Sequence, residues 1–178
     1  VDWGGVHVAQ APFDYAGLPA KYGLTGTGIG AGFASKLCAA ELMIRAGTNV
    51  INLFSENDWD THGSDGNKER FLLAAQLINP MKTFINRISD PADLGASHNV
   101  VVAIMGDFSR SLPGDDHQPN LSITVIGKYV KVGTTGKVAG NVSLPANTPG
   151  SREMWGYLAA AAKAPSNPFG GNPHGLVL

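Results

Sequence analysis

Two polar segments, residues 55–63 and 106–117, carry the residue types that could hold a metal ion. The first reads Ser-Glu-Asn-Asp-Trp-Asp-Thr-His-Gly, and the second reads Gly-Asp-Phe-Ser-Arg-Ser-Leu-Pro-Gly-Asp-Asp-His. Each follows a short apolar run and contains both carboxylates and a histidine. Divalent cations such as zinc, magnesium, calcium or manganese take carboxylate oxygen and imidazole nitrogen as ligands. The sequence therefore predicts part of a divalent-metal site in these segments.

In the first segment the candidate ligands alternate along the chain. Asp58, Asp60 and His62 are two residues apart, so an extended backbone would direct them to one side. Asp60 and His62 are therefore plausible as two ligands of the same metal ion. A single Asp–His pair is more often part of a surface loop, and Asp-Gly sequences are common in turns. Two such clusters after consecutive predicted strands favour a metal or anion site over plain turns.

The second segment supplies further carboxylates and a cation. Asp107 directly follows an apolar run, and Asp115, Asp116 and His117 close the segment. Arg110 lies between these carboxylates in the sequence. A guanidinium beside a metal would be repelled by it unless both bound an anionic group, such as phosphate or sulfate. We therefore interpret Arg110 as a residue that binds an anionic substrate.

A helix and a strand are predicted directly before the first segment. Apolar residues repeat with a 3.6-residue period over Gly32–Ala46, and Gly47 is a common residue just after a helix end. Asn49–Phe54 is short and rich in β-forming residues, which predicts a strand. A second amphipathic pattern predicts a helix over Asn67–Ile88, which Pro80 should kink or split.

Two further strands are predicted on either side of the second segment. Asn99–Met105 is apolar without alternation, which is typical of a strand buried on both faces, and Leu121–Ile126 follows the segment. Thr148-Pro149 then begins a helix that runs to Ala164. The element order is that of an α/β fold, and the helical connection between the first two strands favours a mostly parallel sheet. Ligands bind at the carboxyl ends of such strands, so both polar segments should meet there.

Length and composition set limits on the class of protein. The 178 residues suffice for one domain, and 43% of them are apolar. The net charge of −1 gives no general attraction to nucleic acid or to an anionic membrane, so anion binding would need a local site. No apolar run is long enough to span a membrane. Because the first residue is Val, we expect a processed, truncated or partly represented chain.

Several other residues have plainer interpretations. Cys38 falls in the apolar helical pattern and is interpreted as a small buried side chain, while Glu41 and Arg45 are spaced for an ion pair on another helix face. His98, like the other two histidines outside the segments, is expected to be exposed or locally hydrogen-bonded. The glycines at 26–30 have neither the Rossmann nor the Walker spacing, which argues against a phosphate-binding loop.

The motifs in order resemble those of a bacterial family. Trp59-Asp60-Thr61-His62-Gly63, then Gly106-Asp107-Phe108-Ser109-Arg110-Ser111, then Asp116-His117 resemble Trp-Asp-Thr-His-Gly, Ser-Glu-Phe-Gly-Arg-Thr-Pro and Asp-His. These belong to the family catalogued as domain of unknown function 1501, which is related to sulfatases and the alkaline phosphatase superfamily. The resemblance covers roughly residues 30 to 165. It divides the chain into a lead-in (1–30), the C-terminal part of an α/β domain (31–165) and a Gly/Pro-rich tail (166–178).

The resemblance implies a fold, a ligand set and a location. The fold would be an alkaline-phosphatase-like sandwich, and the reaction a metal-dependent hydrolysis of phosphate or sulfate esters. The implied metal ligands are Asp60, His62, Asp107, Asp116 and His117. Export by the twin-arginine route would place the protein in the periplasm or outside the cell. The partner would be a small anionic ester or a protein, and an oligomer is compatible with either.

The sequence also departs from the family pattern. Asp107 replaces the usual Glu, Ser109 the usual Gly, and Ser111-Leu112 the usual Thr-Pro, so the metal geometry would differ. The superfamily's nucleophile lies in an N-terminal segment, and nothing in residues 1–30 matches it; that segment is either missing from this chain or lost. Two hypotheses follow: a metal-dependent hydrolase seen in its C-terminal part, or a non-catalytic binding or structural protein on the same fold, such as a subunit of an extracellular assembly.

Overall fold

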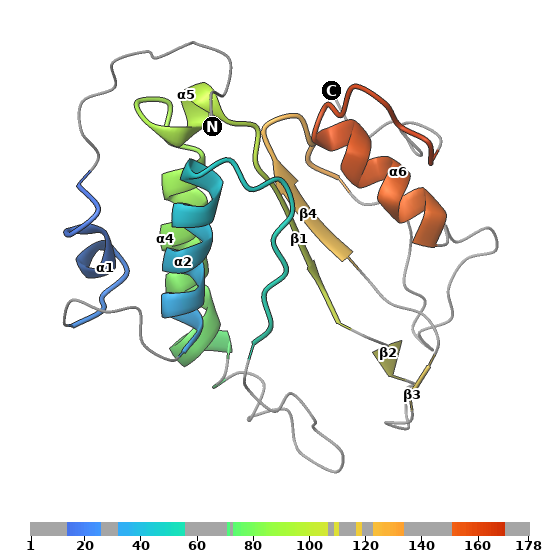
Figure 1. The fold of residues 1–178 in the computed structure, drawn as a ribbon. Coiled ribbons are helices and arrows are strands. Elements are labelled where there is room, and N and C mark those ends of the chain that lie inside the picture. Colours follow the sequence, from blue (N-terminus) through green and yellow to red (C-terminus); the bar gives the residue numbers. More distant parts are fainter. Residues whose placement is uncertain are drawn as a thin grey trace. The chain divides into compact units, whose positions relative to one another are not determined.

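The computed structural model describes residues 14–25, 32–55, 71, 73–106, 109–110, 117–118, 123–133 and 151–169. Contacts within the chain divide it into two units, residues 1–87 and 88–178. The described secondary-structure elements of the first unit are helices, and those of the second are strands and helices (Figure 1). The predicted mixture of helices and strands is therefore confirmed.

Helix α2 (Phe33–Arg45) forms the centre of the first unit and is the helix predicted from the apolar period. It ends just before Gly47, as predicted, and the φ of that glycine is +85°. The amides of Gly47 and Thr48 donate to the carbonyls of Ile44 and Met43. This pattern is common where a glycine in the left-handed conformation ends a helix, and it satisfies carbonyls that the helix leaves open.

A short helix, α1 (Leu18–Lys21), packs against α2. Its Leu18 is 1% exposed, and Tyr22, the residue after the helix, is also buried. The buried apolar side chains of this unit come from α1, α2 and a later helix: Leu18, Tyr22, Leu37, Cys38, Ala40, Ile44 and Phe84. Cys38 is fully buried, which confirms its interpretation as a small core residue.

Pro80 changes the helical turn that precedes it. Leu73–Leu77 is a π-helix (η1), and α4 (Ile78–Ile88) follows directly. Proline has no backbone N–H, and its ring conflicts with the carbonyl four residues earlier, which is that of Gln76 in η1. A wider π-helical turn at this point relieves that conflict. The helix predicted over Asn67–Ile88 is thus confirmed over its described part, with a change of helix type before the proline.

In the second unit, β1 (Val101–Met105) pairs with β4 (Ile123–Gly127), and the shorter β2 (Ser109–Arg110) pairs with β3 (His117–Gln118). Both pairs are antiparallel. Since β2 and β3 lie in the stretch that joins β1 to β4, the two pairs are nested in one hairpin (Figure 1). We call residues 101–127 the nested hairpin. The strands predicted at Asn99–Met105 and Leu121–Ile126 are confirmed over their described residues.

The pairing of the strands differs from the prediction. The mostly parallel sheet required Asn49–Phe54 to pair with the strand at 99–105, but both described pairs are antiparallel, and residues 50–55 form no strand. A hairpin lets neighbouring strands pair without a helical crossover, and β1 uses this local route. The prediction that β1 is buried on both faces is also wrong, because Ile104 and Met105 are 38% and 45% exposed.

Helix α6 (Ser151–Ala161) confirms the helix predicted after Thr148-Pro149 over its described residues, and it packs against β1. The side-chain amide of Asn99, just before β1, donates to the carbonyl of Ala161 at 3.0 Å. A short helix, α5 (Leu94–Ser97), precedes β1 and contributes the buried Leu94. Among the described residues of this unit, the buried apolar side chains are Ile88, Leu94 and Ala161.

The chain after α6 is packed on that helix as far as Phe169. The side-chain amide of Asn167 donates to the carbonyl of Gly156 at 2.9 Å, and the amide of Phe169 donates to the Asn167 side chain at 3.1 Å. A Cβ at Gly156 would lie 3.2 Å from the Phe169 carbonyl oxygen, so a glycine permits this close approach. The first residues of the predicted Gly/Pro-rich tail, up to Phe169, are therefore held against α6.

Candidate functional site

Three residues of the second polar segment lie in the paired strands of the nested hairpin: Ser109, Arg110 and His117. Met105, the last residue of β1, lies opposite Ile123, the first residue of β4. Residues 106–122 therefore leave and return at the same end of the β1–β4 pair. Within this stretch β2 and β3 pair again, and Arg110 lies directly opposite His117. Residues opposite one another in an antiparallel pair belong to the same face of the ribbon.

The structure locates only some of the predicted site residues. Arg110 and His117 are described through their backbone, as partners in β2–β3. The other predicted metal ligands lie outside the described residues: Asp60, His62, Asp107 and Asp116. The described part of the chain holds no group of three metal-ligating side chains, which leaves the predicted ligand set untested. What the structure adds is the register that places the predicted anion-binding residue opposite a predicted ligand.

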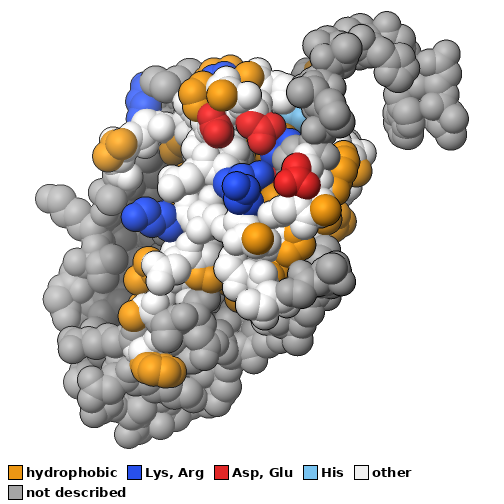
Figure 2. Space-filling view, turned by 90° about the vertical axis from the view of Figure 1, so that its left-hand side faces the viewer, with side chains coloured by type: hydrophobic (Ala, Val, Ile, Leu, Met, Phe, Trp, Pro, Cys, Tyr) orange, Lys and Arg blue, Asp and Glu red, His pale blue; other side chains and the backbone are white. Residues whose placement is uncertain are grey.

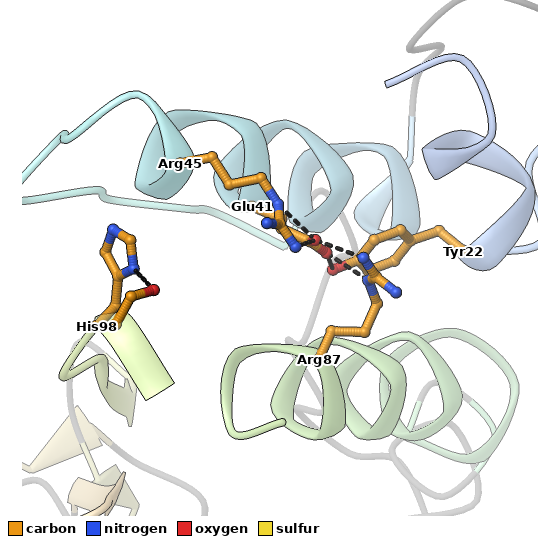
Figure 3. A network of polar contacts seen from close by, with 6 residues as sticks. Tyr22, Glu41, Arg45, Arg87 and His98 are labelled. Atoms are coloured by element: carbon orange, nitrogen blue, oxygen red, sulfur yellow. Dashed lines mark hydrogen bonds and ion pairs between the residues drawn. The ribbon is translucent and has the colours of Figure 1, made fainter. Parts of the chain in front are cut away.

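A second charged cluster lies in the first unit around Glu41 (Figure 3). The predicted Glu41–Arg45 ion pair is confirmed, but sequence reasoning missed the contributions of Tyr22 and Arg87. The Glu41 side chain is completely buried. The Tyr22 hydroxyl donates to Glu41 Oε2 at 2.7 Å. Arg45 donates through Nε and Nη2 to Oε1 at 3.0 and 2.7 Å, and Arg87 donates to both oxygens at 2.6 Å. We call these four residues the Glu41 cluster.

The partners of Glu41 determine its charge state. Burial alone would raise the pKa of Glu41, but the hydrogen bonds from Arg87, Arg45 and Tyr22 outweigh burial and hold the pKa below its usual range. Burial and the hydrogen bond to Glu41 raise the pKa of Tyr22 far above its usual range. Glu41 is therefore an anion and Tyr22 a neutral donor at neutral pH. With both carboxylate oxygens occupied and no exposure, Glu41 has no room for a metal or a substrate.

Comparison with known proteins assigns the family. A model of the family described as "Protein of unknown function (DUF1501)" matches residues 14–143, which is most of the chain. The chain belongs to the DUF1501 family. Comparisons with curated proteins and with solved structures each find no significant match. The predicted resemblance to this family is confirmed, and the DUF1501 match includes both polar segments, the Glu41 cluster and the nested hairpin.

The remaining observations on this DUF1501 protein concern its other charged and polar residues. The Ser97 hydroxyl lies 2.8 Å from Nδ1 of His98, which confirms the expected local hydrogen bond. On the face shown in Figure 2, acidic and basic side chains lie among one another, in keeping with the small net charge. None of the described helices is long and apolar enough to cross a membrane.

Proposed function

We propose that this DUF1501 protein contributes the C-terminal share of a divalent-metal centre that hydrolyses phosphate or sulfate esters. The observation that carries the proposal is the β2–β3 register, in which Arg110 lies opposite His117. A residue suited to bind an oxyanion and a residue suited to bind a metal thereby share one face of a two-stranded ribbon. That combination fits an anionic ester held between a cation and a guanidinium.

The donor set fits a hard or borderline divalent cation. It combines two imidazoles with three carboxylates: His62, His117, Asp60, Asp107 and Asp116. When bound, such a cation would polarise the ester oxygen as a Lewis acid. Arg110 would hold the non-bridging oxygens by paired N–H donors and balance their charge. The residue that attacks the ester is not assigned to any position of this sequence.

The proposal extends to the fold and the location that the resemblance implies. The complete fold would be an alkaline-phosphatase-like sandwich, a mostly parallel sheet flanked by helices. The antiparallel nested hairpin would then lie at the edge of that sheet, where many mostly parallel sheets carry an antiparallel strand. Twin-arginine export would place the site in the periplasm or outside the cell, where it would meet small anionic esters.

A second candidate is a non-catalytic binding or structural protein on the same fold. It is favoured by the departures from the family motif, above all by Asp107 in place of Glu. The shorter side chain moves the carboxylate oxygens back by about one methylene group, a distance that metal coordination does not tolerate without rearrangement. This candidate predicts an incomplete ligand set and no bound metal.

Elemental analysis of the purified protein separates the two candidates. The hydrolase proposal predicts a stoichiometric divalent metal that is lost in His62→Ala and in His117→Ala. His98→Ala is the matched control, because that histidine has a local hydrogen bond and no predicted ligand role. Chromogenic phosphate and sulfate monoesters then test turnover. Metal-free protein after dialysis against zinc and manganese, with folding verified by circular dichroism, would refute the proposal.

A further inference from the structure

The turn after β4 presents a lysine–tyrosine pair on a fixed backbone. The amide of Val130 donates to the carbonyl of Gly127 at 3.1 Å and closes a turn around Lys128 and Tyr129. A Cβ at Gly127 would already contact the side chain of Val130 at 3.4 Å, so the turn is closely packed at its base. Lys128 is exposed and Tyr129 is half-buried. The ammonium of Lys128 lies 5.8 Å from the centre of the Tyr129 ring.

A second lysine reaches the same ring from the end of α6. Lys163 has a left-handed φ of 55°, and its amide donates to the carbonyl of Ala160 while the next amide donates to that of Ala159. This helix ending fixes the backbone of Lys163. Its ammonium lies 4.6 Å from the Tyr129 ring centre, within the range of a cation–π contact. Two elements distant in sequence thus hold two ammonium groups at one aromatic ring.

The same turn continues with another lysine and an apolar tip. Lys131 is exposed, and the side chain of Val132 is 106% exposed, that is, fully open to solvent. We call Lys128, Tyr129, Lys131, Val132 and Lys163 the basic turn. Its five residues include three lysines and no carboxylate, on a chain whose net charge is −1. Its apolar tip, its aromatic ring and its lysines are the three side-chain types that meet at a lipid–water boundary.

We propose that the basic turn is a docking surface for an anionic lipid bilayer. Lysine ammonium groups would lie among anionic headgroups, Tyr129 would lie at their level, and Val132 would enter the upper acyl region. Each lysine near such a surface strengthens binding by about fivefold. The exposed Val132 favours a lipid surface over a nucleic acid or a free phosphate, because only the lipid gives an apolar side chain a place to insert.

Vesicle flotation tests the proposal with the whole chain. Binding is measured to vesicles of phosphatidylcholine alone and to an equal mixture of phosphatidylcholine and phosphatidylglycerol, at low and at high salt. We expect binding to the mixture alone, weakened by salt. Lys128→Gln combined with Lys163→Gln should reduce it about thirtyfold. Val132→Ser should reduce it several-fold while leaving the salt dependence unchanged.

The matched control removes the same charge elsewhere. Lys21→Gln combined with Lys82→Gln neutralises two exposed lysines of the first unit and should leave vesicle binding unchanged. Thermal unfolding verifies that each variant is folded. An equal loss of vesicle binding in the control would show that binding depends only on the net charge of the chain, and it would overturn the proposal. So would absence of vesicle binding, equal binding to both vesicle types, or binding to heparin with none to the vesicles.

Discussion

The Glu41 cluster and the second polar segment both combine carboxylates with arginine. The first stabilises the fold, whereas the second is predicted to bind ligands. In the cluster, one carboxylate meets two guanidinium groups and a phenol, and every oxygen lone pair has a donor close by. In the second segment, one guanidinium, that of Arg110, is accompanied by three aspartates. In the cluster both oxygens of the buried carboxylate are hydrogen-bonded, so the cluster stabilises the fold. The segment has an excess of negative charge that a divalent cation would neutralise.

The largest effect is expected from breaking the Glu41 cluster. Glu41→Gln removes the carboxylate charge that faces the guanidinium groups of Arg45 and Arg87, which are 10% and 22% exposed. Removing one partner of a buried ion pair costs about 3–5 kcal/mol. Urea unfolding followed by circular dichroism measures the loss. Asp14→Asn, which changes an exposed carboxylate but retains the acceptor for the Gly17 amide, is the control and should change little.

One outcome would contradict the structural role of the Glu41 cluster. If Glu41→Gln left the free energy of unfolding unchanged but removed a bound metal, Glu41 would belong to the metal centre and not to the core.

The next largest effect is expected when His117, the predicted metal ligand, and Arg110, the predicted anion-binding residue, are replaced separately. His117→Ala should weaken metal affinity by at least about 100-fold, since even a residue that only supports a ligand is worth 10- to 100-fold. Arg110→Met should maintain or raise the metal affinity, because removing a cation beside a metal removes a repulsion, but it should abolish competition by inorganic phosphate. Metal titration and phosphate competition measure the two effects on the same samples. Equal effects of both variants on both readouts would contradict the separate roles.

The pH dependence of stability should distinguish the contribution of Glu41 from that of Tyr22. Because the folded pKa of Glu41 is lowered, its contribution is complete above the ordinary glutamate pKa of about 4.3 and is lost as the pH falls toward the folded value. Because the folded pKa of Tyr22 is raised, its contribution is complete below about 10 and is lost as the pH rises above it.

Tyr22→Phe should therefore remove the alkaline loss and retain most of the acid loss, at a cost of roughly 1.5–3 kcal/mol at neutral pH for the hydrogen bond to a charged group. Unfolding midpoints across the pH range measure both. An alkaline loss that persists in Tyr22→Phe would assign it to another group.

The elements that the sequence predicts are those fixed by local pattern. The 3.6-residue period of α2, the glycine after it and the apolar run of β1 depend on neighbouring residues alone. The burial of Glu41 could not be predicted from the Glu41–Arg45 spacing, because Tyr22 and Arg87 lie 19 and 46 residues away. The sequence indicates this burial only when two features are considered together. One is a glutamate within an apolar helix, and the other is an arginine in the last turn of a second helix.

The nested hairpin shows the same limit for the candidate site. Sequence pattern placed Arg110 and His117 in one polar segment, but their opposition in β2–β3 depends on the backbone register, which turn conformation sets. The helical connection before β1 suggested a parallel neighbour. The short return to β4 made the antiparallel partner closer in sequence, and the closer partner is the one that pairs.

The smallest effect is expected from the residues that follow the ends of α2 and α6. Gly47 and Lys163 both occupy the left-handed position after a helix, with φ of 85° and 55°. A Cβ at Gly47 would meet nothing within 4 Å, so Gly47→Ala should cost about 1–2 kcal/mol through backbone conformation alone. Lys163→Gly relieves a similar backbone cost, but it adds unfolded-state entropy and loses the contact with Tyr129.

These terms nearly offset, so Lys163→Gly alone should change the free energy of unfolding by less than about 0.5 kcal/mol. In a Tyr129→Leu background the cation–π term is already absent, and Lys163→Gly should then stabilise the second unit by roughly 0.5–1 kcal/mol. Urea unfolding of the four proteins in this cycle measures the difference. An identical effect in both backgrounds would mean that the Lys163–Tyr129 contact contributes nothing to stability.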